Sequence, residues 1–278
     1  MSEFIDPKSL NNYSFKSIGT CWNIYLDNNN PKLTTNIKNI CTLFENRFSR
    51  FISASELYKP KNKSGYFKSS HEFVRILRIY QKLYTISDKR FTPLIAIRLE
   101  DLGYDENYSF ISKERLREIP DFLENIKIIS KNVIFINKPI SFDFGGIGKG
   151  YLIEKLFKYL KTKCNTFIID ASGDIKYFDI KKRLVKIGLM SYKHDKIIGY
   201  SKLKSGLSLH GSSNHIRRWL THSHIVNPLT NKSDSDIEVW VLGKNSILCD
   251  FICKLPFLDF DKGEINSKFP DYEVLIVD

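Results

Sequence analysis

A cluster of closely spaced glycines constrains the fold of this chain more than any other sequence feature. The cluster lies in residues 141–150, which read Ser-Phe-Asp-Phe-Gly-Gly-Ile-Gly-Lys-Gly. Because glycine has no Cβ, the backbone here can approach a ligand or a neighbouring segment closely. Apolar residues then recur at helical spacing, namely Tyr151, Leu152, Leu156, Phe157 and Leu160. An apolar run at 164–170 follows, so we expect a glycine loop, a helix and a buried strand in succession.

Two interpretations of the glycine loop stay open at this point. The first turn of a helix offers unpaired N–H groups and the positive end of the helix dipole, which suit a phosphate. The spacing is neither that of a Walker A loop, since no Ser or Thr follows the Gly-Lys pair, nor GxGxxG. These residues alone therefore predict either a phosphate site or only a tight connection between strand and helix.

The composition predicts a globular protein with a well-filled core. The chain has 278 residues, of which 42% are hydrophobic and 13% aromatic. This excludes a disordered chain and suffices for one large domain or two closely packed lobes. Because we find no repeat, no low-complexity tract and no linker, we expect a single domain over residues 1–278.

The order of the predicted elements favours the α+β class. We expect residues 1–14 to be loosely held and the first strand to span 17–27. Helices are expected at 37–48, 69–87, 95–103 and 246–257. Further strands are expected at 133–136, 185–190, 197–203, 222–227, 237–243 and 272–277. Helices dominate before residue 177 and strands after it, without regular βαβ alternation, and this pattern is typical of α+β rather than doubly wound folds.

The net charge of +12, from 43 basic and 31 acidic residues, limits the partner classes. The lysines are spread along the chain in short runs, which favours a solvated basic surface over a nucleic-acid platform. We therefore expect no nucleic-acid partner, although a basic surface attracts phosphates or an acidic protein.

The cysteines and the N-terminal segment indicate where the protein works. The five cysteines form neither a disulfide framework nor a zinc framework, and this predicts buried thiols in a reducing compartment. The first residues lack a basic and an apolar signal region, and the chain has no 18-residue apolar run. We expect a cytoplasmic protein without a transmembrane segment.

Several short motifs occur in a fixed order along the chain. The strongest is Asp-Phe-Gly-Gly-Ile-Gly-Lys-Gly-Tyr at 143–151, followed by Asp-Ala-Ser-Gly-Asp at 170–174 and His-Ile-Val-Asn-Pro-Leu-Thr-Asn at 224–231. Weaker motifs are Ile-Gly-Thr at 18–20, Phe-Ser-Arg-Phe at 48–51, Ser-Glu-Leu at 55–57, Phe-Thr-Pro at 91–93 and Cys-Asp-Phe-Ile-Cys-Lys at 249–254. Together they resemble the FAD:protein FMN transferase family, also called the ApbE or thiamine-biosynthesis lipoprotein family.

This resemblance implies a fold, an activity and partners. The fold is an ApbE-like, T-fold-related α+β domain with mixed or antiparallel sheets and flanking helices. The activity splits FAD at its pyrophosphate, moves FMN onto a Ser or Thr hydroxyl of an acceptor protein, releases AMP and uses Mg²⁺. Phosphoryl transfer needs mainly positioning and charge neutralisation, which a glycine loop, a lysine and a metal ion supply. Members of the family are often exported or membrane-anchored.

The same resemblance implies roles for individual residues. His224 matches the general base, and Gly146, through its carbonyl, and Asp250 match the metal ligands. The residues that match the FAD site are Phe51, Phe91, Thr92, Asp143, Lys149 and Ile225. Each also has a simpler interpretation: His224 as a surface histidine next to His222, Asp143 as a turn carboxylate, and Lys149 as one lysine among many.

Departures from the family pattern gather around the flavin and the metal. Thr92 and Asn227 stand where the family has Asp, and Phe51 stands where it has Tyr. Lys254 stands where a metal-binding Thr is expected, and a protonated lysine donates hydrogen bonds but cannot ligate a cation. The alternative is therefore a catalytically degenerate protein of the same fold that binds FAD or another nucleotide.

Overall fold

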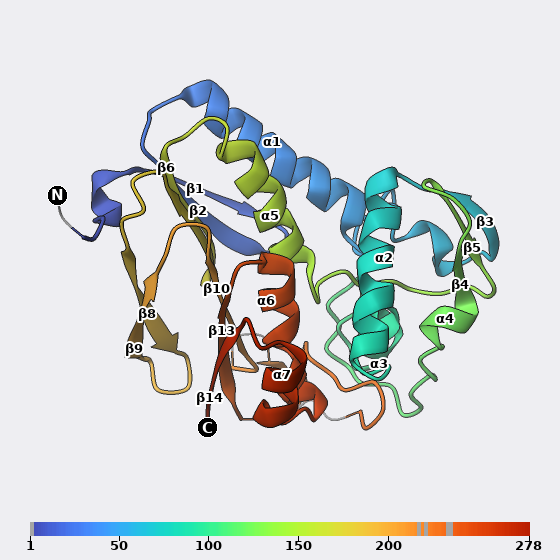
Figure 1. Cartoon of the computed structure of the whole chain (residues 1–278). Coiled ribbons are helices and arrows are strands. Elements are labelled where there is room, and N and C mark those ends of the chain that lie inside the picture. The colour runs from blue at the N-terminus through green and yellow to red at the C-terminus, as the bar shows by residue number, and fades with distance from the viewer. Residues whose placement is uncertain (1–2, 216–217, 220–221, 232–235) are drawn as a thin grey trace.

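A seven-stranded antiparallel sheet is the centre of this computed structural model, which describes residues 3–215, 218–219, 222–231 and 236–278 (Figure 1). Its strands are β1 (Asn11–Ser17), β2 (Thr20–Leu26), β6 (Thr166–Ala171), β7 (Asp174–Asp179), β10 (Ser208–Ser213), β13 (Glu238–Gly243) and β14 (Glu273–Val277). They lie in the order β1-β2-β6-β7-β10-β13-β14, and every neighbouring pair is antiparallel. The predicted α+β class is confirmed.

Both faces of the sheet are covered. Helices α1 (Pro31–Phe48), α5 (Gly148–Leu160), α6 (Ser246–Ile252) and α7 (Lys262–Lys268) lie over one face (Figure 1). The ribbon of β8 (Val185–Ser191) and β9 (Lys196–Leu203) lies over the other (Figure 1). In β6, Phe167 and Ile169 join the core beneath the helices and Ile168 joins the core beneath the ribbon. A strand buried on both faces reads as a continuous apolar run, as 167–169 does.

A second group of elements packs beside α1 and α5 (Figure 1). It consists of α2 (His71–Ile86), α3 (Ala96–Asp101), α4 (Phe122–Asn125) and a small sheet of β3 (Gly65–Lys68), β5 (Val133–Ile136) and β4 (Ile126–Ile128). The predicted apolar stripe of α2 is buried, and its rings Phe73 and Tyr80 lie 5.5 and 5.4 Å from the ring of Phe144 in the glycine loop. The largest core cluster therefore runs through both groups of elements.

The observed structure differs from the expected one in two segments. Residues 11–14, which belong to the segment expected to be loose, form β1 together with residues 15–17, because Ile18 and Gly19 adopt positive φ and turn the chain back onto β2. The ring of Phe15 then stacks on that of Trp22 at 6.3 Å. The strand expected at 222–227 is shorter: β12 (His222–Ser223) pairs with β11 (Arg218–Trp219), and the described residues 224–227 lie outside any strand before the turn at 228–230.

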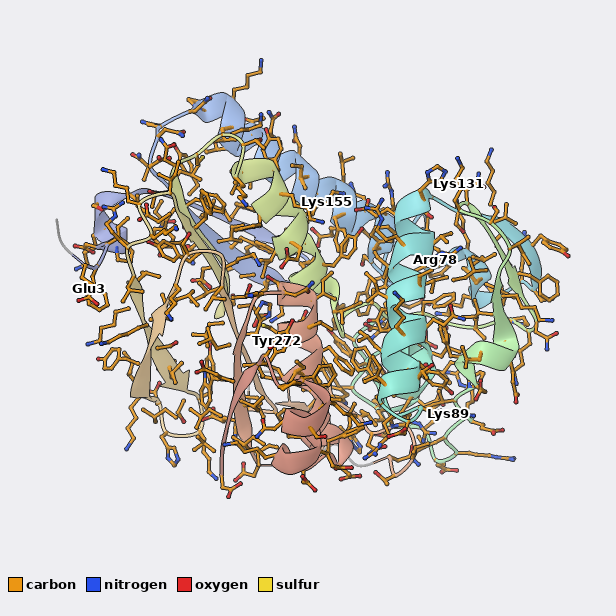
Figure 2. All side chains as sticks on the ribbon, viewed as in Figure 1. Glu3, Arg78, Lys89, Lys131, Lys155 and Tyr272 are labelled. Carbon is orange, nitrogen blue, oxygen red and sulfur yellow. The ribbon has the colours of Figure 1, made fainter. Side chains whose placement is uncertain are left out.

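Charged side chains lie at well-separated points of the surface. Figure 2 labels five of them, Glu3, Arg78, Lys89, Lys131 and Lys155. Among the described residues, none of the helices has the length and apolar character needed to cross a bilayer.

Close contact between α5 and α6 depends on Gly150. A Cβ at this position would lie 2.8 Å from the carbonyl carbon of Ser246, closer still to its oxygen, and 2.9 Å from the Cβ of Asp250. A Cβ at Gly148, at the start of the same helix, would have nothing within 4 Å. The absence of a side chain is therefore needed at Gly150 and not at Gly148.

We predict that Gly150→Ala lowers the free energy of unfolding by about 1–3 kcal/mol, because an extra methyl group in a packed core forces the backbone apart. Gly148→Ala is the matched control, and it should be neutral or slightly stabilising because alanine is the better helix former. Urea denaturation of both variants measures the difference. Equal losses in the two variants would contradict this account of the α5–α6 contact.

Candidate functional site

A cleft of about 710 Å³ lies where the glycine loop meets the end of α1, the start of α3 and the segment after β12. Its walls are mainly apolar and aromatic, and they include Phe44, Phe48, Tyr80, Ile95, Leu99, Tyr104, Tyr108, Phe110, Trp219 and Leu258. Basic side chains also line it, namely Arg50, Arg90, Lys149 and Lys254. Such a cleft has the size and lining typical of sites for small molecules and cofactors.

The cleft brings together the residues that the resemblance singled out, except one. The predicted residues that line it are Phe51, Phe91, Thr92, Asp143, Gly146, Lys149, His224 and Ile225. Asp250 does not line the cleft but lies buried behind it, while Lys254 from the same segment does line it. The residues therefore gather around one cleft, and their predicted roles stay predictions.

Arg50 connects the segments that form the aromatic end of the cleft, which is the end lined by Phe51, Tyr104 and Tyr108. Its Nε donates to Oδ2 of Asp143 at 2.8 Å, and its Nη2 donates to the backbone carbonyl of Tyr104 at 2.6 Å. Its guanidinium carbon also lies 4.2 Å from the ring centre of Phe51 and 4.8 Å from that of Tyr104. A single nearly buried side chain thus joins the glycine loop, the loop after α1 and the segment that follows α3.

Several predicted residues have local structural partners. Asp143 accepts the backbone N–H of Gly145 at 2.5 Å, which agrees with its interpretation as a turn carboxylate. The hydroxyl of Thr92 accepts the N–H of Leu94 at 3.2 Å and caps the short 3-10 helix Pro93–Ile95. Asn227 donates to Oδ2 of Asp259 at 2.7 Å and accepts the N–H of Leu229.

Asn227 also explains why this chain departs from the family pattern. Its amide nitrogen donates to Asp259, and its amide oxygen accepts the N–H groups of Leu229 and Thr230. An aspartate here would bring a second carboxylate against Asp259 and would lose the donor. The substitution therefore complements this chain's own Asp259.

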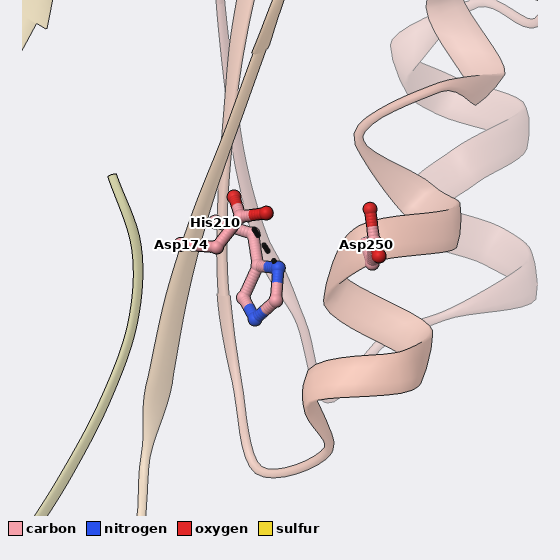
Figure 3. A group of neighbouring side chains, drawn as sticks. All are labelled: Asp174, His210 and Asp250. Atoms are coloured by element: carbon pink, nitrogen blue, oxygen red, sulfur yellow. Dashed lines mark ion pairs between the residues drawn. The ribbon is translucent and has the colours of Figure 1, made fainter. Parts of the chain in front are cut away.

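Behind the glycine loop lies a buried polar cluster whose three members the sequence did not predict to lie together (Figure 3). It consists of Asp174 on β7, His210 on β10 and Asp250 on α6, with one potential ligand atom of each lying within 4.8 Å of the others. All three side chains are buried. The motif at 170–174 marks Asp174, but no sequence signal links it to His210.

Asp174 is already neutralised within this cluster. Its Oδ2 lies 2.6 Å from Nζ of Lys149, and its Oδ1 accepts the N–H of Gly211 at 3.1 Å and lies 3.5 Å from Nδ1 of His210. Burial by itself would raise the pKa of the Asp174 carboxyl, but Lys149 and His210 outweigh it and hold that pKa well below its usual range.

Asp250 likewise has a partner at each of its carboxylate oxygens. Its Oδ2 accepts the N–H of Gly150 at 2.8 Å, and its Oδ1 forms an ion pair with the ammonium of Lys254. The same ammonium donates to the backbone carbonyl of Asp250 at 2.7 Å. A divalent ion at Asp250 would have to displace Lys254, so the residues present do not fit the metal ion that the resemblance implies.

Comparison with known proteins assigns the chain to a family. Residues 18–264 match the model of the ApbE family, and the chain therefore belongs to that family. The predicted resemblance is confirmed. None of the curated proteins matches the chain at the sequence level.

Solved structures share the fold. The ApbE protein of Thermotoga maritima has a TM-score of 0.86 and 20% identity, with 96% of this chain and 94% of that chain covered. The flavinyl transferase ApbE of Pseudomonas stutzeri, in its apo form, has a TM-score of 0.75 and 14% identity, with 96% and 92% covered. The flavin transferase ApbE of Vibrio cholerae has a TM-score of 0.73 and 16% identity, with 95% and 92% covered.

We predict that Arg50→Met destabilises the protein by about 2 kcal/mol, since it leaves Asp143 and the Tyr104 carbonyl without their donor. Amide hydrogen exchange of residues 103–110 should also accelerate, because Arg50 ties this segment to the glycine loop. Arg78→Met, an exposed position on α2, is the control and should change neither property. Unchanged exchange in Arg50→Met would show that Arg50 does not hold this end of the cleft.

Proposed function

We propose that this protein binds FAD in the cleft and transfers FMN from it to a Ser or Thr hydroxyl of an acceptor protein. The observation that carries the proposal is the cleft of about 710 Å³, in which the family motifs at 48–51, 91–93, 143–151 and 224–231 converge. The structural relatives from Pseudomonas stutzeri and Vibrio cholerae are described as flavin transferases, which supports the same reaction class here.

The two ends of the cleft suit the two chemical parts of FAD. The aromatic end offers the ring of Phe51, which lies 5.0 Å from that of Tyr108, and the ring of Tyr104. Flat aromatic rings bind best by stacking or edge contacts with such side chains, so the flavin belongs at this end. The basic end offers Lys149 and Lys254 beside the glycine loop, which suits the pyrophosphate.

The reaction is a displacement at phosphorus. The acceptor hydroxyl oxygen attacks the phosphorus on the FMN side, a new P–O bond forms, and the bond to the AMP oxygen breaks with its electron pair. In this proposal His224, in the cleft wall, takes the proton of the hydroxyl as the general base. Asp143, Phe91, Thr92 and Ile225 line the FAD site. Because Lys254 engages Asp250, no step is assigned to a metal ion at Gly146 and Asp250.

A second candidate is a protein of the same fold that binds FAD without transferring FMN. The Lys254–Asp250 ion pair favours it, since it occupies the carboxylate that the resemblance assigns to the catalytic metal. Release of AMP separates the two candidates, because only the transferase breaks the pyrophosphate.

We predict that Phe51→Ala weakens FAD binding about tenfold, because the flavin loses a stacking surface worth on the order of 1 kcal/mol or more. Quenching of FAD fluorescence during titration measures the dissociation constant. Tyr66→Ala, at an exposed ring on β3, should leave the affinity unchanged. If Phe51→Ala and the wild type bind FAD with equal affinity, the flavin does not bind at this end of the cleft.

We predict that His224→Gln retains FAD binding and lowers AMP release about a hundredfold, as expected for loss of a general base. AMP is measured by chromatography. Covalently attached flavin is measured by the fluorescence of acceptor peptides, which are supplied as a pool of peptides that contain Ser and Thr. His194→Gln, in the exposed turn between β8 and β9, is the control. FAD binding without AMP release in the wild type would favour the second candidate, and no FAD binding would overturn both.

A further inference from the structure

Two buried carboxylates behind the cleft are each paired with a lysine that lines the cleft. Asp174 pairs with Lys149 at 2.6 Å, and Asp250 pairs with Lys254. The carboxylates are 1% and 2% exposed, whereas the lysine side chains are 27% and 12% exposed. The negative charge therefore lies inside the protein, and the positive charge lies at the cleft surface.

The two ion pairs already complete the charge balance that a divalent ion would supply. Two carboxylates require two positive charges, and the two ammonium groups provide them. A divalent cation added to this arrangement would face two like charges at close range in a buried setting, where such repulsion is poorly screened. It would also find both oxygens of Asp250 engaged, one by Lys254 and one by the N–H of Gly150.

The ammonium of Lys254 retains a donor for a ligand. Of its three N–H groups, one goes to Oδ1 of Asp250 and one to the carbonyl of Asp250, and among the described residues no further acceptor is assigned to it. The other cations of the cleft are committed elsewhere. Arg50 bonds Asp143 and Tyr104, and Arg90 bonds the carbonyls of Leu258 and Asp259 and stacks on Phe260.

We propose that Lys254, together with Lys149 in the lining of the same cleft, is a fixed cation that replaces a divalent metal ion, so that the cleft binds a pyrophosphate without metal. Lysine binds phosphate as a compact point charge, and here the buried carboxylates hold it in position. The inference rests on the proposed function for the identity of the ligand as FAD. Beyond the proposed function, we infer that Lys254 determines specificity by making pyrophosphate binding independent of a metal ion.

The first experiment titrates FAD and ADP into the full chain by calorimetry, in excess EDTA and in excess Mg²⁺. The wild type should bind both ligands equally under the two conditions. Lys254→Thr should bind about tenfold more weakly in EDTA, which corresponds to the loss of one charge-assisted contact, and should recover when Mg²⁺ is present. Lys254→Met should stay weak in both, and Lys262→Thr, at an exposed position on α7, should behave as the wild type.

A second measurement tests the metal site directly, without any nucleotide. Electron paramagnetic resonance of Mn²⁺ should detect no tightly held ion in the wild type and one bound ion in Lys254→Thr. Lys254→Arg keeps the positive charge and should exclude Mn²⁺ as the wild type does, and thermal melting identifies any variant that fails to fold.

The outcomes separate this inference from the proposed function. FAD binding by the wild type that requires Mg²⁺, or tight Mn²⁺ binding by the wild type, would overturn the inference and leave the proposed function intact. No binding of FAD or ADP under either condition would overturn the proposed function and the phosphate role of Lys254. The Mn²⁺ measurement would still decide whether Lys254 excludes the metal.

Discussion

The buried carboxylate of Asp250 is the interaction on which the site depends. One of its oxygens accepts the N–H of Gly150 in the first turn of α5, and the other holds the ammonium of Lys254 one turn further along its own segment. A buried carboxylate is costly unless each oxygen finds a donor, so α5 and α6 must meet in one register. Gly150 permits that register because it has no side chain to separate the helices. This contact fixes the glycine loop relative to α6, and the loop in turn forms part of the cleft wall.

Most of the helical framework is predictable from the sequence because local periodicity determines it. The spacing of apolar residues in α2 and α5 is by itself enough to identify their buried faces. β1 is not predictable in this way, because it is an edge strand with polar Asn11, Asn12 and Ser14, and only the turn at Ile18 and Gly19 brings it onto β2. Lys176 in β7 shows the same limit, since its burial depends on Glu154, Ser208 and the carbonyl of Lys244 from three other segments.

The residues of the candidate site also differ in whether local sequence or distant partners reveal them. Motif residues such as Asp143, Lys149 and His224 are found from the sequence because each lies in a short recognisable segment. Arg50 and His210 are not, since their importance arises from partners that are distant in the chain, namely Asp143 and Asp174. Lys254 is an intermediate case. The sequence identifies it as a departure from the family pattern, but only the structure shows that its ammonium pairs with Asp250 and lines the cleft.

The order of strands in the large sheet has a consequence for how the protein folds. β2 pairs with β6, with Asn23 opposite Asp170, so the pairing must close a long loop before it gains any hydrogen bonds. Such non-local pairing has a high entropic cost and slows the search for the native topology. β14 covers the far edge only after residue 277 has left the ribosome, and until then β13 has an unpaired side. During synthesis the incomplete sheet thus exposes strand edges that can pair with other chains.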